Sequence, residues 1–73
     1  MSNKKIVFRR VFATKIGQQL DVGLVGGPVI TGEVIEVYPD MVTIKVVFTT
    51  SPVQFLYTIA FDAVAYIRHR VER

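Results

Sequence analysis

The side chains that could support catalysis are few and lie far apart in the sequence. His69 is the only histidine, Ser2 and Ser51 are the only serines, and the chain has no cysteine. Neither serine stands in a sequence context that would supply a base to activate its hydroxyl. No set of residues shows metal-ligand spacing, and the lack of cysteine excludes thiolate sites and thiol chemistry. We therefore expect neither an enzyme nor a bound metal or cofactor.

Three side chains at predicted turns have the chemistry to bind a nucleobase. Tyr38 could stack on a base, and Asp40 or Asp62 could accept hydrogen bonds from a base edge. Each also has a structural interpretation. Tyr38 could pack across a subunit interface, Asp40 could serve the Pro-Asp turn, and Asp62 could cap a tight turn through backbone amides.

Charge is separated along the chain, although the net charge is only +3. The first fifteen residues hold five basic and no acidic side chains, and the last six hold three arginines against one glutamate. Basic ends can attract phosphate backbones, or they can simply keep an apolar assembly soluble. The candidate phosphate-binding residues are Lys4, Lys5, Arg9 and Arg10.

The chain is rich in apolar residues for its length. Hydrophobic residues make up 51% of its 73 residues, and the mean hydropathy is +0.41. A single domain of this size has a small core, so part of its apolar surface must face a partner, a membrane or a ligand, and self-association is the simplest of these. The longest apolar stretch, residues 52–67, is too short for a membrane helix and contains Asp62. No signal peptide is predicted, because Arg9 and Arg10 interrupt the apolar run. We expect one cytoplasmic domain without a membrane segment.

The N-terminal segment is predicted to form a helix over residues 3–16. Phe8, Phe12 and Ile16 recur at a spacing of four, which is typical of one helix face. A strand at residues 6–8 is the competing interpretation.

After the helix, apolar residues recur at every second position, which predicts strands that are buried on one face. Glycine, proline and short polar runs separate these segments, as turns do. The five predicted strands cover residues 19–24, 29–38, 41–49, 53–59 and 64–68.

The second predicted strand contains a glycine in its interior. Alternation places Ile30, Gly32, Val34 and Glu36 on one face. A glycine inside a strand indicates a sharp bend or a close approach of another backbone. Small barrels need such a bend to close. One helix followed by five short strands therefore predicts an all-β fold, a small, strongly bent antiparallel barrel.

This order of elements resembles the Sm and Sm-like family, which includes bacterial Hfq. The first motif of the family is similar to residues 16–24, a glycine turn, residues 31–37 with Gly32 at the family's glycine position, and then Met41. The second motif is similar to residues 57–67. The resemblance covers roughly residues 3–68 and implies a single Sm-like domain over residues 1–73.

The resemblance implies a ring in which the fourth strand of one subunit pairs with the fifth strand of the next. Physical reasoning agrees, because apolar edge strands aggregate unless they are paired, and a head-to-tail contact that closes leaves no free edge. The chain itself is thus the expected partner. The candidate interface residues are Gln54, Phe55, Leu56, Tyr57, Val64, Tyr66 and Ile67.

The family commonly binds RNA, but the residues at its RNA-reading turns differ here. Tyr38 stands at the usual Asp position and Val42 at the usual Asn position. The Arg-Gly-Asn/Asp turn of the second motif reads as residues 60–62, in which only Asp62 fits. The Tyr-Lys-His run of Hfq reads as residues 57–59 and lacks the Lys and the His.

The sequence predicts a homo-oligomeric ring that binds single-stranded RNA in altered pockets. A structural or protein-interaction ring that has lost the RNA site is the alternative. A monomeric or dimeric barrel within a larger complex is a third interpretation.

Overall fold

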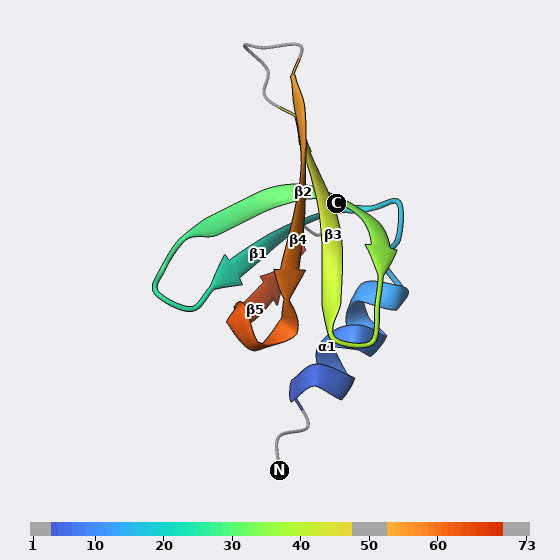
Figure 1. The fold of residues 1–73 in the computed structure, drawn as a ribbon, viewed down its shortest axis with the longest axis vertical. Coiled ribbons are helices and arrows are strands. Elements are labelled where there is room, and N and C mark those ends of the chain that lie inside the picture. The colour runs from blue at the N-terminus through green and yellow to red at the C-terminus, as the bar shows by residue number, and fades with distance from the viewer. Residues whose placement is uncertain (1–3, 48–52, 70–73) are drawn as a thin grey trace.

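A computed structural model describes residues 4–47 and 53–69 as one helix packed against a β-sheet (Figure 1). The elements in chain order are α1 (Lys4–Ala13), β1 (Gln19–Leu24), β2 (Val29–Val37), β3 (Met41–Val47), β4 (Gln54–Ala60), the 3-10 helix η1 (Phe61–Ala63) and β5 (Val64–Arg68). The prediction of a helix followed by five strands is confirmed. Three stretches of these predictions lie outside the described residues: residue 3 of the helix, residues 48–49 of the third strand, and the polar break at residues 49–52.

The five strands form one antiparallel sheet in the order β4-β3-β2-β1-β5. Strands β1, β2 and β3 each pair with the next strand along the chain, and β5 returns to pair with β1. Strands β4 and β5 are consequently the two edges. Within residues 4–47 and 53–69 no pairing joins these edges, so the closure that the predicted barrel requires is not observed in the single chain.

The core is formed by residues of the strands together with one residue each from α1 and η1. Its two aromatic residues stack: the ring centroids of Phe12 in α1 and Phe61 in η1 are 5.7 Å apart, with an angle of 9° between the ring planes. This contact fixes the helix to the connection between β4 and β5 (Figure 1). The buried apolar residues are Phe12, Leu20, Val22, Val34, Val42, Ile44, Ile59, Phe61 and Val64.

The helix is shorter than predicted, and Ile16 does not belong to it. After Ala13, the hydroxyl of Thr14 donates to the carbonyl of Val11 over 2.8 Å, and such local bonds compete with continued helix. Gly17 has a φ of +86°, a left-handed conformation that suits glycine. Ile16 is exposed and forms an isolated bridge with Val34, so the predicted i, i+4 stripe ends at Phe12.

Strand β2 departs from the predicted alternation near its end, but it has the predicted close approach at Gly32. A register shift lies between Val34 and Glu36, which is typical of a β-bulge. Because of this shift, Glu36 is exposed rather than on the core face, and Val37 packs against the core instead. At Gly32, an added Cβ would lie 2.5 Å from the carbonyl oxygen of Lys45. The predicted close approach of another backbone at Gly32 is therefore confirmed.

Candidate functional site

The turn between β2 and β3 and the turn between β4 and β5 lie next to each other. Met41 pairs with Ala60 at the end of the β3–β4 ladder, which places the two turns at the same end of the sheet (Figure 1). The amide of Phe61 donates to the carbonyl of Asp40 over 3.0 Å and ties the turns together. The amide of Tyr38 donates to the carbonyl of Met41 over 2.8 Å and closes the first turn. Two segments that are separate in sequence thus form one surface.

Helix α1 adds a basic side chain to this surface. Phe12 in the last turn of the helix stacks on Phe61, and Lys5 in the first turn reaches Asp62, so α1 lies alongside η1. The Nζ of Lys5 is 3.6 Å from Oδ2 of Asp62, and both side chains are largely exposed. An exposed pair of this kind contributes well under about 1 kcal/mol, so it orients the two groups without locking them. Arg9 lies one helical turn after Lys5 and shares its helix face.

Tyr38 combines a partly exposed ring with an engaged hydroxyl. The side chain is 37% exposed, so part of the ring faces solvent. The pKa of the Tyr38 phenol is raised above its ordinary value, mainly by a hydrogen bond to the Glu36 side chain, then by partial loss of hydration and by the charge of Glu36. A hydrogen bond with Thr43 acts in the opposite direction on this pKa. The part of Tyr38 that stays available at the surface is therefore its ring rather than its hydroxyl.

The two acidic candidates differ in their surroundings. The carboxylate of Asp40 is exposed and forms no hydrogen bond or ion pair with any described residue, so its oxygens can accept from a ligand. Asp62 does not cap the tight turn as the structural interpretation suggested. The residue before η1 is Ala60, and no side chain caps this element. Asp62 points instead toward Lys5.

The remaining basic candidates lie along α1. The ammonium of Lys4 is 5.8 Å from the centroid of the Phe8 ring, a cation–π distance. Arg9 and Arg10 are exposed. The structure thus brings together Tyr38, Asp40, Asp62 and Lys5, with Arg9 on the same helix face as Lys5. The other two basic candidates, Lys4 and Arg10, project from different sides of the helix.

The candidate interface residues fall on the two edge strands, but not all are on the surface. Phe55 and Tyr57 lie on one face of β4, with ring centroids 6.4 Å apart, and Leu56 lies on the other. Gln54 is exposed at the start of the strand.

On β5, only part of the predicted interface is accessible. Tyr66 is exposed, and Ile67 is partly buried against the core. Val64 is fully buried, because it completes the core beneath the sheet, so its side chain is not available to a partner. The expectation for Val64 is corrected to a core position that offers only its backbone.

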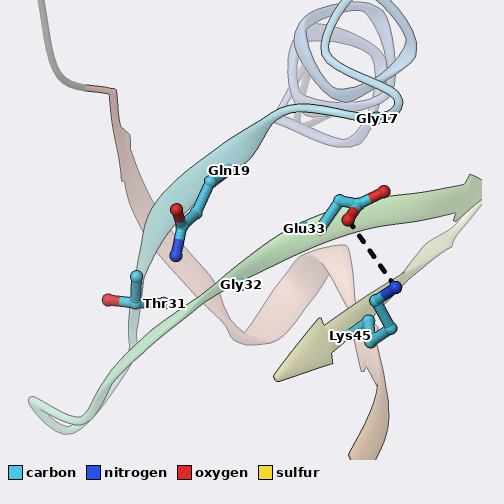
Figure 2. Close-up of a pocket in the computed structure, with 6 residues that line it drawn as sticks. All are labelled: Gly17, Gln19, Thr31, Gly32, Glu33 and Lys45. Carbon is cyan, nitrogen blue, oxygen red and sulfur yellow. Dashed lines mark ion pairs between the residues drawn. The ribbon is translucent and has the colours of Figure 1, made fainter. Parts of the chain in front are cut away.

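A polar depression that the sequence did not indicate lies elsewhere, over the middle of the sheet (Figure 2). Its volume is about 350 Å³, and Gly32 forms part of its floor. Glu33 pairs with Gln19 on one side and with Lys45 on the other in the strand register, and the Lys45 ammonium is 3.7 Å from the Glu33 carboxylate. The lining residues are Gly17, Gln19, Thr31, Gly32, Glu33 and Lys45.

None of the predicted site residues lines this depression. The available signal was the polar alternation on the non-core face of the first three strands. Such alternation is typical of any strand with one face in solvent. Only the strand register shows that Gln19, Glu33 and Lys45 lie side by side.

Within the described segments, no group of three or more histidine, cysteine or acidic residues is arranged to hold a metal ion. Neither α1, with ten residues, nor the short η1 is long and apolar enough to cross a membrane. A scan against protein-family models found no matching family, and searches of curated proteins and of solved structures found no match.

Proposed function

We propose that this chain assembles with copies of itself through its two edge strands into an Sm-like ring, and that the ring binds single-stranded RNA. The observation that carries the RNA site is the convergence of two turns and a basic helix at one end of the sheet.

Assembly is supported by the position and chemistry of the edges. Strands β4 and β5 are at opposite sides of the sheet order, so pairing β4 of one copy with β5 of the next is a head-to-tail contact. Unpaired edge strands offer free backbone donors and acceptors to another chain. The exposed apolar side chains of Phe55, Leu56 and Tyr57 on β4 and of Tyr66 on β5 would be covered by such pairing.

RNA binding is supported by complementary groups at the joined turns. The exposed ring of Tyr38 can stack on a base, and base–aromatic stacking contributes about 1–3 kcal/mol per base. The Asp40 carboxylate can accept from a base edge. Lys5 and Arg9 can contact phosphates, and ring symmetry would repeat these cations around one face.

The test combines native mass spectrometry of the untreated protein with anisotropy titrations of short U-rich and A-rich RNAs. We expect a closed oligomer that binds RNA more weakly as salt rises. Tyr38→Ala should weaken binding by about tenfold or more, whereas Tyr38→Phe should retain it, because stacking needs the ring and not the hydroxyl. An intact ring that binds neither RNA at low salt would reject the RNA site and leave the assembly standing.

A structural or protein-interaction ring is the second candidate, and one contact favours it. Lys5 and Asp62 lie 3.6 Å apart and neutralise each other, which reduces the positive field at the joined turns. If this interpretation holds, Asp62→Asn, which frees the Lys5 charge, should create RNA affinity that the unchanged ring lacks. Saturable RNA binding by the unchanged protein that Tyr38→Ala abolishes would reject it.

A further inference from the structure

Asp21 is a charged residue of β1 that the fold buries. It is 5% exposed, between the core residues Leu20 and Val22. Its Oδ1 accepts a hydrogen bond from the Thr31 hydroxyl over 2.7 Å, and its Oδ2 accepts from Nε of Arg68 over 3.0 Å. The Nη2 of Arg68 is also 3.0 Å from Oδ2. A buried carboxylate must be paired in this way, because burial of an unpaired charge is very unfavourable.

This carboxylate joins three strands at one point. Asp21 lies directly opposite Thr31 in β2 and directly opposite Arg68 in β5. Arg68 is the last residue of β5, and its side chain is 64% exposed, so the cation reaches the buried acid from the surface. The pair therefore fastens the C-terminal end of β5 to the rest of the sheet.

A second contact on the same face of β5 involves Tyr66. Gly23 lies opposite Tyr66 in the register, and the Tyr66 ring occupies the space that a Cβ of Gly23 would fill. Because residues two apart share a face of a strand, Tyr66 and Arg68 lie on Gly23 and Asp21 as two parallel contacts. We refer to these four residues with Thr31 as the β5 clasp.

The clasp acts where the strand pairing alone is weak. Strand β5 has five residues, and β1 is its only strand neighbour in the described chain. The β1–β5 ladder also changes register between Gly23 and Leu24. Val64 and Ile67 hold β5 from the core side, and the clasp holds it from the other side.

We infer that the β5 clasp positions the free edge of β5 for pairing with β4 of a second copy. This inference rests on the proposed assembly. The clasp residues are positioning residues, because they fix the line and twist of the edge rather than contact the partner through their charges. Loss of the clasp should release β5 and dissociate the ring while the other four strands and α1 remain folded.

The test compares variants in the clasp with a matched variant outside it. Arg68→Met removes the cation but keeps an apolar stem, and Asp21→Asn keeps the shape of the carboxylate without its charge. Lys45→Met is the control, because it breaks the Glu33–Lys45 ion pair of β2 and β3 without touching β5. Dilution series followed by native mass spectrometry report assembly, and hydrogen exchange of the backbone amides reports each strand.

We expect both clasp variants to raise the protein concentration at half-dissociation by about tenfold or more, since a hydrogen bond to a charged group is worth at least the 1.4 kcal/mol that this factor represents. Exchange should accelerate in residues 64–68 and stay unchanged in β3. Arg68→Lys, which keeps the charge but loses the fork geometry, should fall between the wild type and Arg68→Met. Lys45→Met should change neither readout.

The clasp is overturned if residues 64–68 exchange at the wild-type rate in both variants, or if all strands exchange faster together, which would make Asp21 a general determinant of folding. If a variant does not fold, its position counts as a general determinant of folding. The milder variant Arg68→Lys then tests whether Arg68 holds the end of β5. A wild-type protein that is monomeric at every concentration would reject the proposed assembly instead. In that case, faster exchange of residues 64–68 alone in the monomeric clasp variants would show that the clasp holds β5 even though the assembly is rejected.

Discussion

At Tyr38, the surroundings raise the pKa of the phenol, and the hydrogen bond with the Glu36 side chain is the largest cause. The Glu36 side chain holds the pKa of Tyr38 above 10.0, its ordinary value. A pKa that is raised on folding gives stability that is fully present below the unfolded value and is lost as the pH rises through the folded value. In a Tyr57→Phe/Tyr66→Phe variant, Tyr38 is the one tyrosine that remains. We predict that its tyrosinate absorbance, followed in a pH titration, reaches its midpoint above pH 10.0. Adding Glu36→Gln should move this midpoint down, and no change on that substitution would contradict the assignment.

At Gly32, the absence of a side chain allows β2 and β3 to approach. An added Cβ would lie 2.5 Å from the Lys45 carbonyl oxygen and 2.6 Å from Cγ2 of Ile44. Since backbone cannot move aside easily, Gly32→Ala should lower the free energy of unfolding by about 1–3 kcal/mol, as overpacking does. Urea denaturation followed by circular dichroism measures this. Stability within about 0.5 kcal/mol of wild type, the usual range for neutral surface changes, would show that the strands separate freely.

The sequence predicted Gly32 and the turn residues, but not Asp21 or the residues of the polar depression. Gly32 is identifiable because glycine has a local meaning inside a strand. Asp21 reads as a solvent-facing residue of a half-buried strand. It is buried because Arg68, 47 positions along the chain, returns to cover it. The burial of Asp21 thus depends on a residue that is distant in the sequence. The pattern of residues around Asp21 does not predict that β5 pairs with β1.

Among the elements, α1 is anchored chiefly by the stacking of Phe12 on Phe61 in η1. Phe12 is fully buried and stacks on Phe61, while Phe8 is only partly buried. Phe12→Ala should destabilise the chain by about 3–5 kcal/mol, a large part of the stability of so small a domain. Phe8→Ala is the control and should cost clearly less. Equal losses in urea denaturation would contradict the view that the Phe12–Phe61 stack is the principal anchor of the helix.

The ends and faces of elements deviated from the sequence prediction for identifiable reasons. Continuation of the helix to residue 16 followed from the spacing of Phe8, Phe12 and Ile16, but the Thr14 hydroxyl bonds back to Val11 and the chain leaves the helix. The alternation of β2 placed Glu36 on the core face, but the bulge after Val34 inserts one extra residue. In both cases a single residue interrupts the regular spacing of apolar side chains. Because elements are predicted from this spacing, their ends and faces are where the prediction fails.

At the scale of the whole molecule, part of the apolar excess in the composition is found in exposed side chains of the two edge strands. With 51% hydrophobic residues, the chain cannot bury all of them in one small core. Leu56 on β4 is 65% exposed, and Phe55 and Tyr57 flank it on the opposite face. Such a strand in an isolated monomer would favour aggregation. A closed arrangement of copies removes this liability for every subunit, which makes the edge the decisive place to test the assembly.

Leu56→Lys tests whether β4 is the assembly edge. A charge on an edge strand opposes pairing with another chain, and ring symmetry would repeat it at every interface. Because Leu56 contributes little to the core of its own chain, we expect the variant to remain folded by circular dichroism but to appear as a monomer in native mass spectrometry. Val25→Lys is a matched control, because Val25 is equally apolar in character and 63% exposed but lies in the turn after β1. If both variants lose the oligomer, the effect is one of added charge alone. If both keep it, β4 is not the edge through which the copies meet.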